Sequence, residues 1–138
     1  MADVASKEDE AALQAAMLAR ARAAMALSHA PHSDFPVGAC VRAVSGQLYA
    51  GCNIENASYP EGWCAETTAI SHMIMAGENQ ITHVLVIAEK QSGATPCGGC
   101  RQRLSEFVTK DAVLYLCDEQ GVSQTMPFTD IFPSGFSL

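Results

Sequence analysis

The chain has 138 residues, of which 49% are apolar and 17% are charged. This length suffices for one domain with a hydrophobic core, and this composition argues against disorder. The net charge is −7, and the eight basic residues are scattered. Because a phosphate backbone is normally bound by clustered Lys and Arg, we expect neither a nucleic-acid partner nor binding to an anionic membrane surface.

Targeting signals and membrane spans are not evident in the sequence. The acidic start, MADVASKEDE, does not resemble a secretory signal. No uncharged run approaches the ~18 residues that a membrane helix needs. We therefore expect a cytoplasmic protein, in which the six cysteines are metal ligands or buried thiols before they are disulfides.

The predicted elements alternate between helices and strands. Residues 6–9 resemble a capping box with Ser6 at the N-cap, and an Ala-rich helix follows to about His29. Two strands joined by a short turn, at 37–44 and 47–54, predict a hairpin. Further along we expect helices at 63–77 and 97–107, strands at 81–89, 112–117 and 121–128, and a short helical turn before an aromatic tail.

This order of elements predicts the fold class. A hairpin followed by alternating strands and helices indicates a mixed sheet with helices on both faces. We expect a three-layer α/β/α sandwich with a mixed five-stranded sheet, forming a single domain over residues 1–138.

Two cysteines in the stretch PCGGC are the first candidates for chemistry. Cys97 and Cys100 are three residues apart at the start of a predicted helix, so both side chains can lie on one face. Taken alone, C-x-x-C is ambiguous between a redox pair, half of a structural zinc site and two packed thiols. A redox pair is disfavoured because the motif comes late in the chain rather than after the first strands.

A third cysteine and a glutamate lie in PEGWCAETTA. Cys64 also opens a predicted helix, where the partial positive charge favours a thiolate. Three thiolates would leave the fourth tetrahedral position of zinc open, as a catalytic site requires. Glu66 could then move protons for water at that position, or it could simply favour the positive end of its helix. None of the four histidines lies at a tight ligand spacing from these cysteines.

The combination of these motifs resembles the short-chain, zinc-dependent cytidine deaminases. CAE at 64–66, followed by PCGGCRQ at 96–102, matches the zinc-deaminase signature. Further similar stretches are PHSDFPVGA (31–39), GCNIENASYPEG (51–62) and FPSGF (132–136), so the resemblance covers nearly the whole chain in order. It implies that Cys64, Cys97 and Cys100 bind one Zn²⁺ per chain. It also implies that Glu66 shuttles protons during the deamination of cytidine and 2′-deoxycytidine in pyrimidine salvage.

The resemblance also implies a nucleoside-binding set. Asn53 and Glu55 are two residues apart at a strand end, so their side chains point the same way and suit sugar hydroxyls; matching residues in the family bind the ribose 3′-hydroxyl. The family is typically a homotetramer with active sites at subunit interfaces. By resemblance, Phe35 lines the pyrimidine pocket, the backbone of Ala65 holds the base, Ala57 lies close by, and Tyr59 and Phe136 reach a neighbouring subunit's site.

Two positions depart from the family pattern. His32 stands where Tyr is common, which we interpret as a packing change. Thr67 stands where many members have an Arg that offsets the net charge of −1 of zinc with three thiolates. The sequence leaves open what replaces that charge; the candidates are the two helix termini, the Thr67 or Thr68 hydroxyl, and an arginine such as Arg101 or Arg103.

Three other functions compete with this interpretation. A deaminase of another small amino-heterocycle would keep the zinc core and change the pocket, and Asn53 and Glu55 argue for a nucleoside instead. A zinc-stabilised interaction module would have no use for Glu66 or an open coordination position. A polynucleotide-editing deaminase is disfavoured by the acidic chain.

Overall fold

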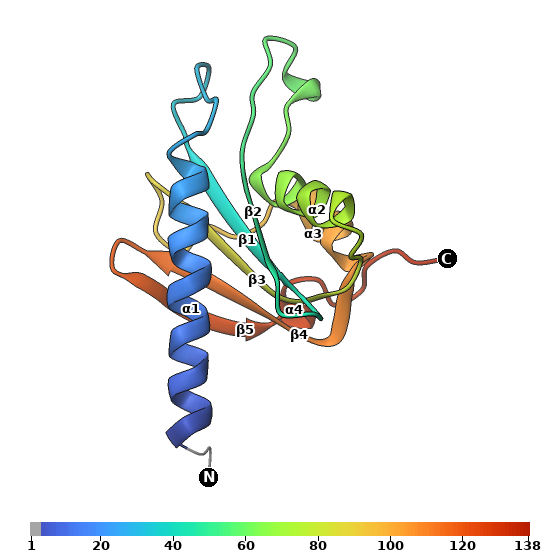
Figure 1. Cartoon of the computed structure of the whole chain (residues 1–138). Helices are drawn as coiled ribbons and strands as arrows, with labels where there is room; N and C mark the ends of the chain where they lie inside the picture. Colours follow the sequence, from blue (N-terminus) through green and yellow to red (C-terminus); the bar gives the residue numbers. More distant parts are fainter. Residues whose placement is uncertain (1–3) are drawn as a thin grey trace.

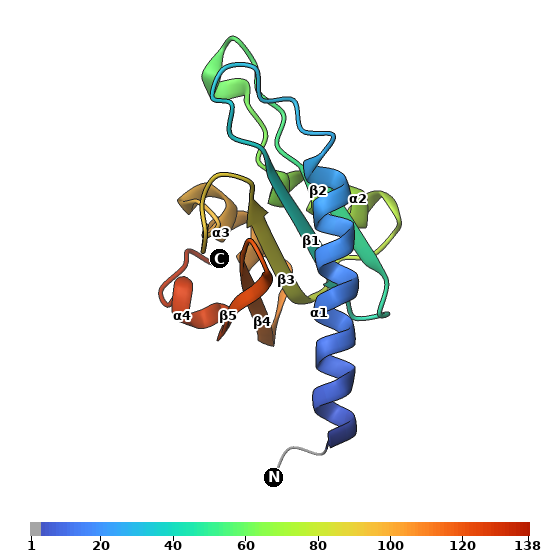
Figure 2. The same ribbon diagram turned by 90° about the vertical axis from the view of Figure 1, so that its left-hand side faces the viewer.

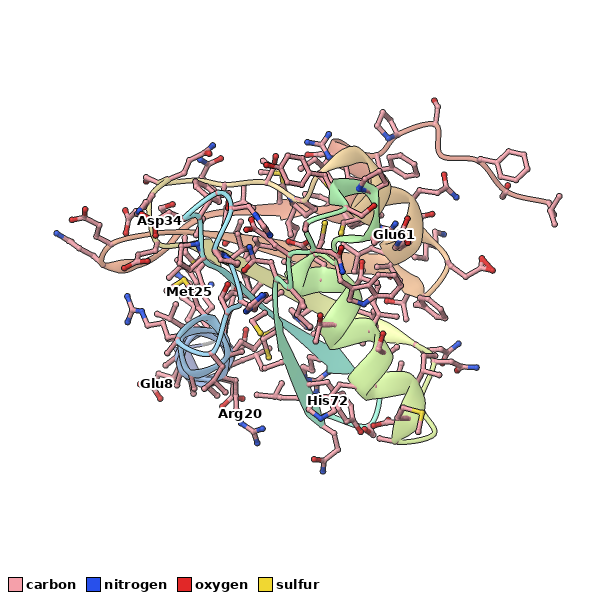
Figure 3. The ribbon with its side chains drawn as sticks, turned by 90° about the horizontal axis from the view of Figure 1, so that it is seen from above. Glu8, Arg20, Met25, Asp34, Glu61 and His72 are labelled. Carbon is pink, nitrogen blue, oxygen red and sulfur yellow. The ribbon has the colours of Figure 1, made fainter. Side chains whose placement is uncertain are left out.

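The computed structural model describes residues 4–138, with side chains from residue 6 onward. Its first element is a long helix, α1 (Val4–Met25), which packs on one face of the sheet (Figure 1). Met17 and Ala21 on α1 are fully buried, whereas Glu8 and Arg20 project outward (Figure 3).

Both ends of α1 differ from the predicted ends of this helix. The predicted N-cap at Ser6 is wrong, because α1 begins at Val4 and Ser6 lies within its first turn; Ala5 and Lys7 are strong helix formers that extend the helix upstream. At the other end α1 stops at Met25 instead of His29. The His29 backbone bonds to a later segment, accepting from Glu55 N at 2.8 Å and donating to Asn53 O at 3.1 Å.

The sheet has five strands in the order β2-β1-β3-β4-β5. The predicted hairpin is present as β1 (Val37–Ala43) and β2 (Leu48–Cys52), which pair antiparallel. β3 (Ile81–Ala88) is antiparallel to β1 and parallel to β4 (Val108–Asp118), and β5 (Gly121–Pro127) is antiparallel to β4. The sheet is therefore mixed, as predicted.

The opposite face of the sheet carries α2 (Ala65–Met75) and α3 (Gly98–Ser105), so the molecule has three layers (Figures 1 and 2). A short helical turn, η1 (Tyr59–Glu61), precedes α2, and α4 (Phe128–Ile131) precedes the C-terminal tail. β4 begins four residues earlier than predicted, because Val108 pairs with Ile81 beyond the regular register of the two strands. Within the described residues, no helix is long and apolar enough to cross a membrane.

Two glycines let the helices approach the hairpin closely from its two faces. A Cβ on Gly38 of β1 would lie 2.1 Å from Ala21 O of α1. A Cβ on Gly51 of β2 would lie 2.6 Å from Ala65 O and 2.4 Å from Ala69 N of α2. Glycine within a strand often marks such a close backbone approach. Gly51 thereby sets the position of the first turn of α2, where the candidate site begins.

Candidate active site and metal centre

Three cysteines meet where the N-termini of α2 and α3 lie side by side. Cys64 is the N-cap residue of α2, Cys97 is the N-cap residue of α3, and Cys100 lies in the first turn of α3. Their sulfurs all lie within 4.8 Å of one another, and the Cys64 and Cys97 sulfurs are 3.7 Å apart. Two thiolates at about 2.3 Å from a tetrahedral zinc ion are separated by about 3.8 Å, so this spacing fits zinc.

The protonation of these thiols also fits a cation site. The pKa of Cys64 is lowered, chiefly because the Cys100 thiol donates a hydrogen bond to it. The pKa of Cys100 is raised by that same interaction, by burial and by the nearby Glu66 carboxylate. Without a cation, ionisation of the Cys100 thiol is therefore disfavoured. A divalent metal would supply the positive charge that lets all three ionise.

Glu66 lies in the first turn of α2 and is only 4% exposed. Burial raises the pKa of its carboxyl, while the Cys100 side chain, its own backbone N–H and the Arg103 charge act in the opposite direction. A carboxyl group with a raised pKa exchanges protons more readily near neutral pH. The structure thus places the Glu66 side chain next to Cys64 and Cys100.

Two side chains, those of Thr67 and Arg103, lie next to the Cys100 sulfur. Thr67 Oγ1 lies 3.5 Å from Cys100 Sγ, and Arg103 Nη1 donates to the same sulfur at 3.9 Å. Two of the other candidates form hydrogen bonds elsewhere: Thr68 Oγ1 donates to Cys52 O at 2.9 Å, and Arg101 Nε donates to Pro96 O at 2.8 Å.

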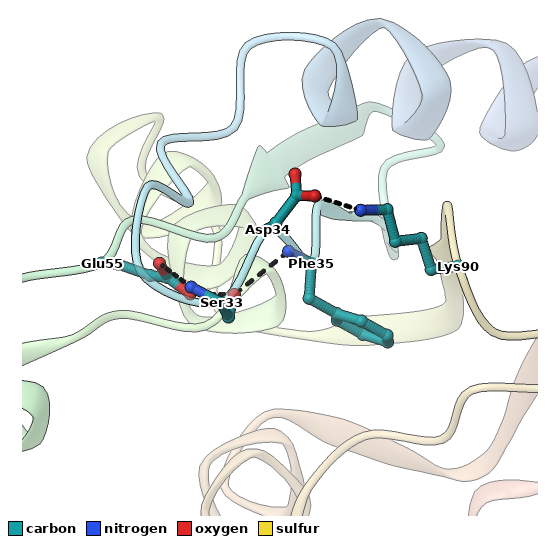
Figure 4. A network of polar contacts seen from close by, with 5 residues as sticks. All are labelled: Ser33, Asp34, Phe35, Glu55 and Lys90. Atoms are coloured by element: carbon teal, nitrogen blue, oxygen red, sulfur yellow. Dashed lines mark hydrogen bonds and ion pairs between the residues drawn. The ribbon is translucent and has the colours of Figure 1, made fainter.

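Glu55 is held by the loop that precedes β1. One carboxylate oxygen, Oε1, accepts from the backbone N–H groups of His32 at 2.9 Å and Ser33 at 3.1 Å. The other, Oε2, accepts from the Ser33 hydroxyl (Figure 4). These bonds, the Ser33 hydroxyl first, lower the pKa of Glu55 despite partial desolvation. Glu55 therefore stays ionised and is fixed in direction.

The Asn53 side chain forms hydrogen bonds with the protein through both its oxygen and its nitrogen atom. Its Oδ1 accepts from Val37 N at 2.9 Å and from the Ser28 hydroxyl, and its Nδ2 donates to Phe35 O at 2.9 Å. Asn53 thus joins the end of β2 to the loop before β1. Phe35 lies in that loop, and its ring points away from the Asp34 carboxylate, which pairs with Lys90 (Figure 4).

Most of the remaining predicted residues lie in one of two cavities or in the first turn of α2. Glu55 and Tyr59 share a cavity of about 310 Å³ with His32, whose ring packs against that of Tyr59 at 5.7 Å between centroids. Ala65 is buried and opens α2, whereas Ala57 is exposed.

Phe136 lies apart from this cavity in the single chain. It is 70% exposed, and its backbone exchanges hydrogen bonds of 3.1 and 3.3 Å with the Gln102 side chain. It lines a groove of about 620 Å³ that also includes Thr67 and Arg103. The C-terminal tail extends away from the body of the molecule (Figure 1).

Sequence reasoning missed two parts of the site. Nothing in the pattern singled out Ser33 as the partner of Glu55, because that contact joins two loops 22 residues apart. Trp63, whose ring lies 5.8 Å from the Arg103 guanidinium carbon, was also missed. For the contact between Arg103 and Cys100 the sequence did offer a signal. The two residues are three apart on a predicted helix, and residues at that spacing share a face.

Comparison with known proteins agrees with this geometry. Residues 8–116 match the family model described as the cytidine and deoxycytidylate deaminase zinc-binding region. The chain is 34% identical over 121 residues to a cytidine deaminase from Sporosarcina psychrophila, covering 88% of this chain and 89% of the relative. A crystal structure of cytidine deaminase from Burkholderia pseudomallei superposes with a TM-score of 0.82 at 34% identity, covering 88% of this chain and 98% of that one.

The fold and the three-cysteine site therefore define a zinc-dependent deaminase, a hydrolase. More particularly, the chain belongs to the cytidine and deoxycytidylate deaminase family. The predicted fold class, the family and the zinc cofactor are confirmed.

Proposed function

We propose that this chain hydrolyses cytidine and 2′-deoxycytidine to uridine and 2′-deoxyuridine, with release of ammonia, as a step of pyrimidine salvage. The observation that carries the proposal is a buried carboxylate, Glu66, in the first turn of the helix that follows Cys64, beside the three grouped cysteines. Three protein ligands leave a position for water, whereas a structural zinc site would be closed by a fourth ligand.

In this proposal Cys64, Cys97 and Cys100 hold the zinc ion, and Glu66 handles the protons. When bound, zinc supplies a Lewis acid that lowers the pKa of a coordinated water molecule. Glu66 takes the first proton from the attacking water as its oxygen bonds to C4 of the cytosine ring, and delivers that proton to N3. Glu66 then moves the second proton to the amino group, the C4–N bond breaks, and ammonia and the uracil carbonyl remain.

Substrate orientation would come from the first turn of α2 and the end of β2. The first backbone N–H groups of a helix have no intrahelical acceptor, so the Ala65 backbone is available to the base. Phe35 would line the base pocket, with Ala57 nearby. Asn53 retains one amide hydrogen and Glu55 one carboxylate lone-pair site after their bonds to the protein.

One donor and one acceptor match a single hydroxyl group. A sugar recognised through one hydroxyl, such as the 3′-hydroxyl, need not carry a 2′-hydroxyl. This count supports the inclusion of both ribose and 2′-deoxyribose among the substrates. The Glu55 carboxylate also disfavours a phosphate near the sugar.

We further propose that the single domain assembles into a homotetramer with active sites at its interfaces. Tyr59 and Phe136 are 74% and 70% exposed, which supports a role against a neighbouring subunit rather than in their own chain. The cysteines are all free thiols, as in proteins of a reducing compartment, and a cytoplasmic location is part of the proposal.

One assay tests the proposed activity. Ammonia release is measured for cytidine, 2′-deoxycytidine, cytosine, adenosine and single-stranded DNA, with zinc content determined on the same samples. Turnover of both cytosine nucleosides, and of none of the others, is expected. Preferential turnover of adenosine, free cytosine or DNA by a zinc-loaded protein would reject the proposed substrate class.

A further inference from the structure

The metal centre carries a negative charge that the chain has to balance. Zinc with three thiolate ligands has a net charge of −1, and Glu66 adds a carboxylate beside it. Of the three sulfurs, that of Cys100 is the most enclosed, because this residue is fully buried. Charge that cannot reach water is costly unless a hydrogen-bond donor or a cation compensates it.

We propose that Arg103 is the positioning residue that stabilises the Cys100 thiolate and so sets the zinc affinity of this chain. Its Nη1 donates to Cys100 Sγ at 3.9 Å from one helical turn further along α3. A charge-assisted hydrogen bond of this kind favours the ionised sulfur, and hydrogen bonds to metal ligands tune metal affinity. The proposal rests on the zinc site and not on the identity of the substrate.

The surroundings of the guanidinium are shaped to hold it. Its carbon lies 5.8 Å from the centroid of the Trp63 ring, within the range of a cation–π contact. Gly99 leaves room on another side, because a Cβ there would lie 3.2 Å from Nη1 and 3.7 Å from Cζ. Trp63 directly precedes Cys64, so Arg103 also links the segment that starts α2 to the first turn of α3.

Thr67 occupies a second position from which the same sulfur can be reached. Its side chain is 5% exposed, and its hydroxyl lies 3.5 Å from Cys100 Sγ. Thr67 and Arg103 line the same groove of about 620 Å³, so a longer side chain at position 67 has space to extend toward the Arg103 guanidinium. Positions 67 and 103 are therefore alternative sources for one positive charge, and in this chain position 103 supplies it.

The presence of Arg103 determines how an arginine at position 67 would change the zinc affinity. With Arg103 present, Thr67→Arg adds a second cation where the charge is already balanced, and zinc affinity gains little. With Arg103 removed, the same substitution restores the lost charge. A purely structural role for Arg103 on the surface of α3 would not predict this dependence.

The test measures the zinc dissociation constant by competition with a chromogenic chelator at one fixed pH, without substrate. Arg103→Ala and Arg103→Gln are expected to weaken binding by about 10- to 100-fold, the range found when an outer partner of a metal ligand is removed. Arg103→Lys should recover part of the loss. Arg103→Ala combined with Thr67→Arg should recover most of it. Arg20→Ala, on the outer side of α1, is the matched control and should bind zinc as the wild type does.

Two results would overturn the proposal. The first is wild-type zinc affinity in both Arg103→Ala and Arg103→Gln. The second is a folded double variant, by circular dichroism, that binds zinc no more tightly than Arg103→Ala. Should the double variant not fold, the comparison of Arg103→Lys with Arg103→Gln decides, because only the lysine keeps the charge. Tight zinc binding with no deamination would instead count against the proposed function.

Discussion

Cys64 and Cys97 share one local feature: each is the N-cap residue of a helix. Both have extended backbone conformations, with φ of −76° and −67°, and each precedes a helix whose first N–H groups have no intrahelical acceptor. The positive ends of α2 and α3 favour thiolates. Because Cys100 lies in the first turn of α3, three sulfurs converge, and among the side chains that the structure describes no fourth His, Cys, Asp or Glu joins this group.

Removing one of these ligands should empty the site. Cys97→Ala is expected to lower zinc affinity by more than about 100-fold, beyond the cost of losing an outer hydrogen-bond partner of a ligand, and to abolish activity. Zinc content by elemental analysis should fall from about one ion per chain to near zero. Cys117→Ala, which removes a buried thiol of the sheet, should retain zinc. Full zinc content in Cys97→Ala would contradict the assigned ligand set.

Ser33 controls the charge of the proposed sugar-binding carboxylate. Its hydroxyl is the largest cause of the lowered pKa of Glu55. A carboxyl whose pKa is lowered stays ionised until the pH falls through that lowered value. Ser33→Ala should therefore raise the pKa of Glu55, so that KM for cytidine begins to rise at a higher pH on acidification.

At neutral pH the same variant loses the hydrogen bond that orients Glu55. We expect KM to increase by about 2- to 10-fold with kcat less affected, the range for one lost hydrogen bond. Steady-state kinetics across the acid range provide both readouts. An unchanged KM and an unchanged acid limb would remove Ser33 from the binding site.

Among the elements, the β1–β2 hairpin lies between α1 and α2 and packs against both. Gly38 and Gly51 let α1 and α2 approach its opposite faces. In Gly51→Ala the new methyl group would overlap the α2 backbone, which cannot retreat without moving the first turn that carries Glu66. We expect a loss of about 1–3 kcal/mol in the free energy of unfolding, as for other overpacked positions.

Urea unfolding with zinc present measures this loss. Gly98→Ala is the matched control, because a Cβ there has no neighbour within 4 Å and it lies in the first turn of a helix. Gly51→Ala with wild-type stability would show that the close packing of β2 against α2 is not needed.

Most elements could be predicted from the sequence because their patterns are local. The β-branched run at Ile81–Ala88 and the turn at Gly77, with φ of +88°, follow directly from residue type. The start of α1 was misplaced because Ser6 carries a cap signal that the neighbouring helix formers override. The three cysteines and Glu66 were predicted from two short motifs that resemble the zinc-deaminase signature, each of which is local.

The parts of the site that were not predicted depend on contacts between distant segments. Trp63 meets Arg103 across 40 positions of sequence, and the Asn53 amide bonds to Phe35 O across 18. The first contact exists because α2 and α3 lie next to one another in the folded chain, and the second because the end of β2 lies beside the loop that precedes β1. The sequence could therefore name Arg103 as one of several possible charges but could not select it.

At the scale of the whole molecule, charge selects among substrates. The net charge of −7 and the Glu55 carboxylate both oppose a second negative charge near the sugar. Cytidine should therefore show a higher kcat/KM than cytidine 5′-monophosphate, by at least about 10-fold, which corresponds to one close, unfavourable charge contact of about 1.4 kcal/mol. Raising the salt concentration should narrow the difference by screening. Faster turnover of the monophosphate would contradict the assigned pocket.

In the proposed mechanism, Glu66 moves the protons of a zinc-dependent deamination. The most direct test compares wild type with Glu66→Gln at equal zinc content, following uridine and ammonia formed from cytidine. The wild type should form the two products in equal amounts. Glu66→Gln should keep its zinc and lose about 10²- to 10⁴-fold in kcat, because an amide cannot accept and return the proton. A zinc-loaded Glu66→Gln variant that turns over cytidine at the wild-type rate would contradict the account.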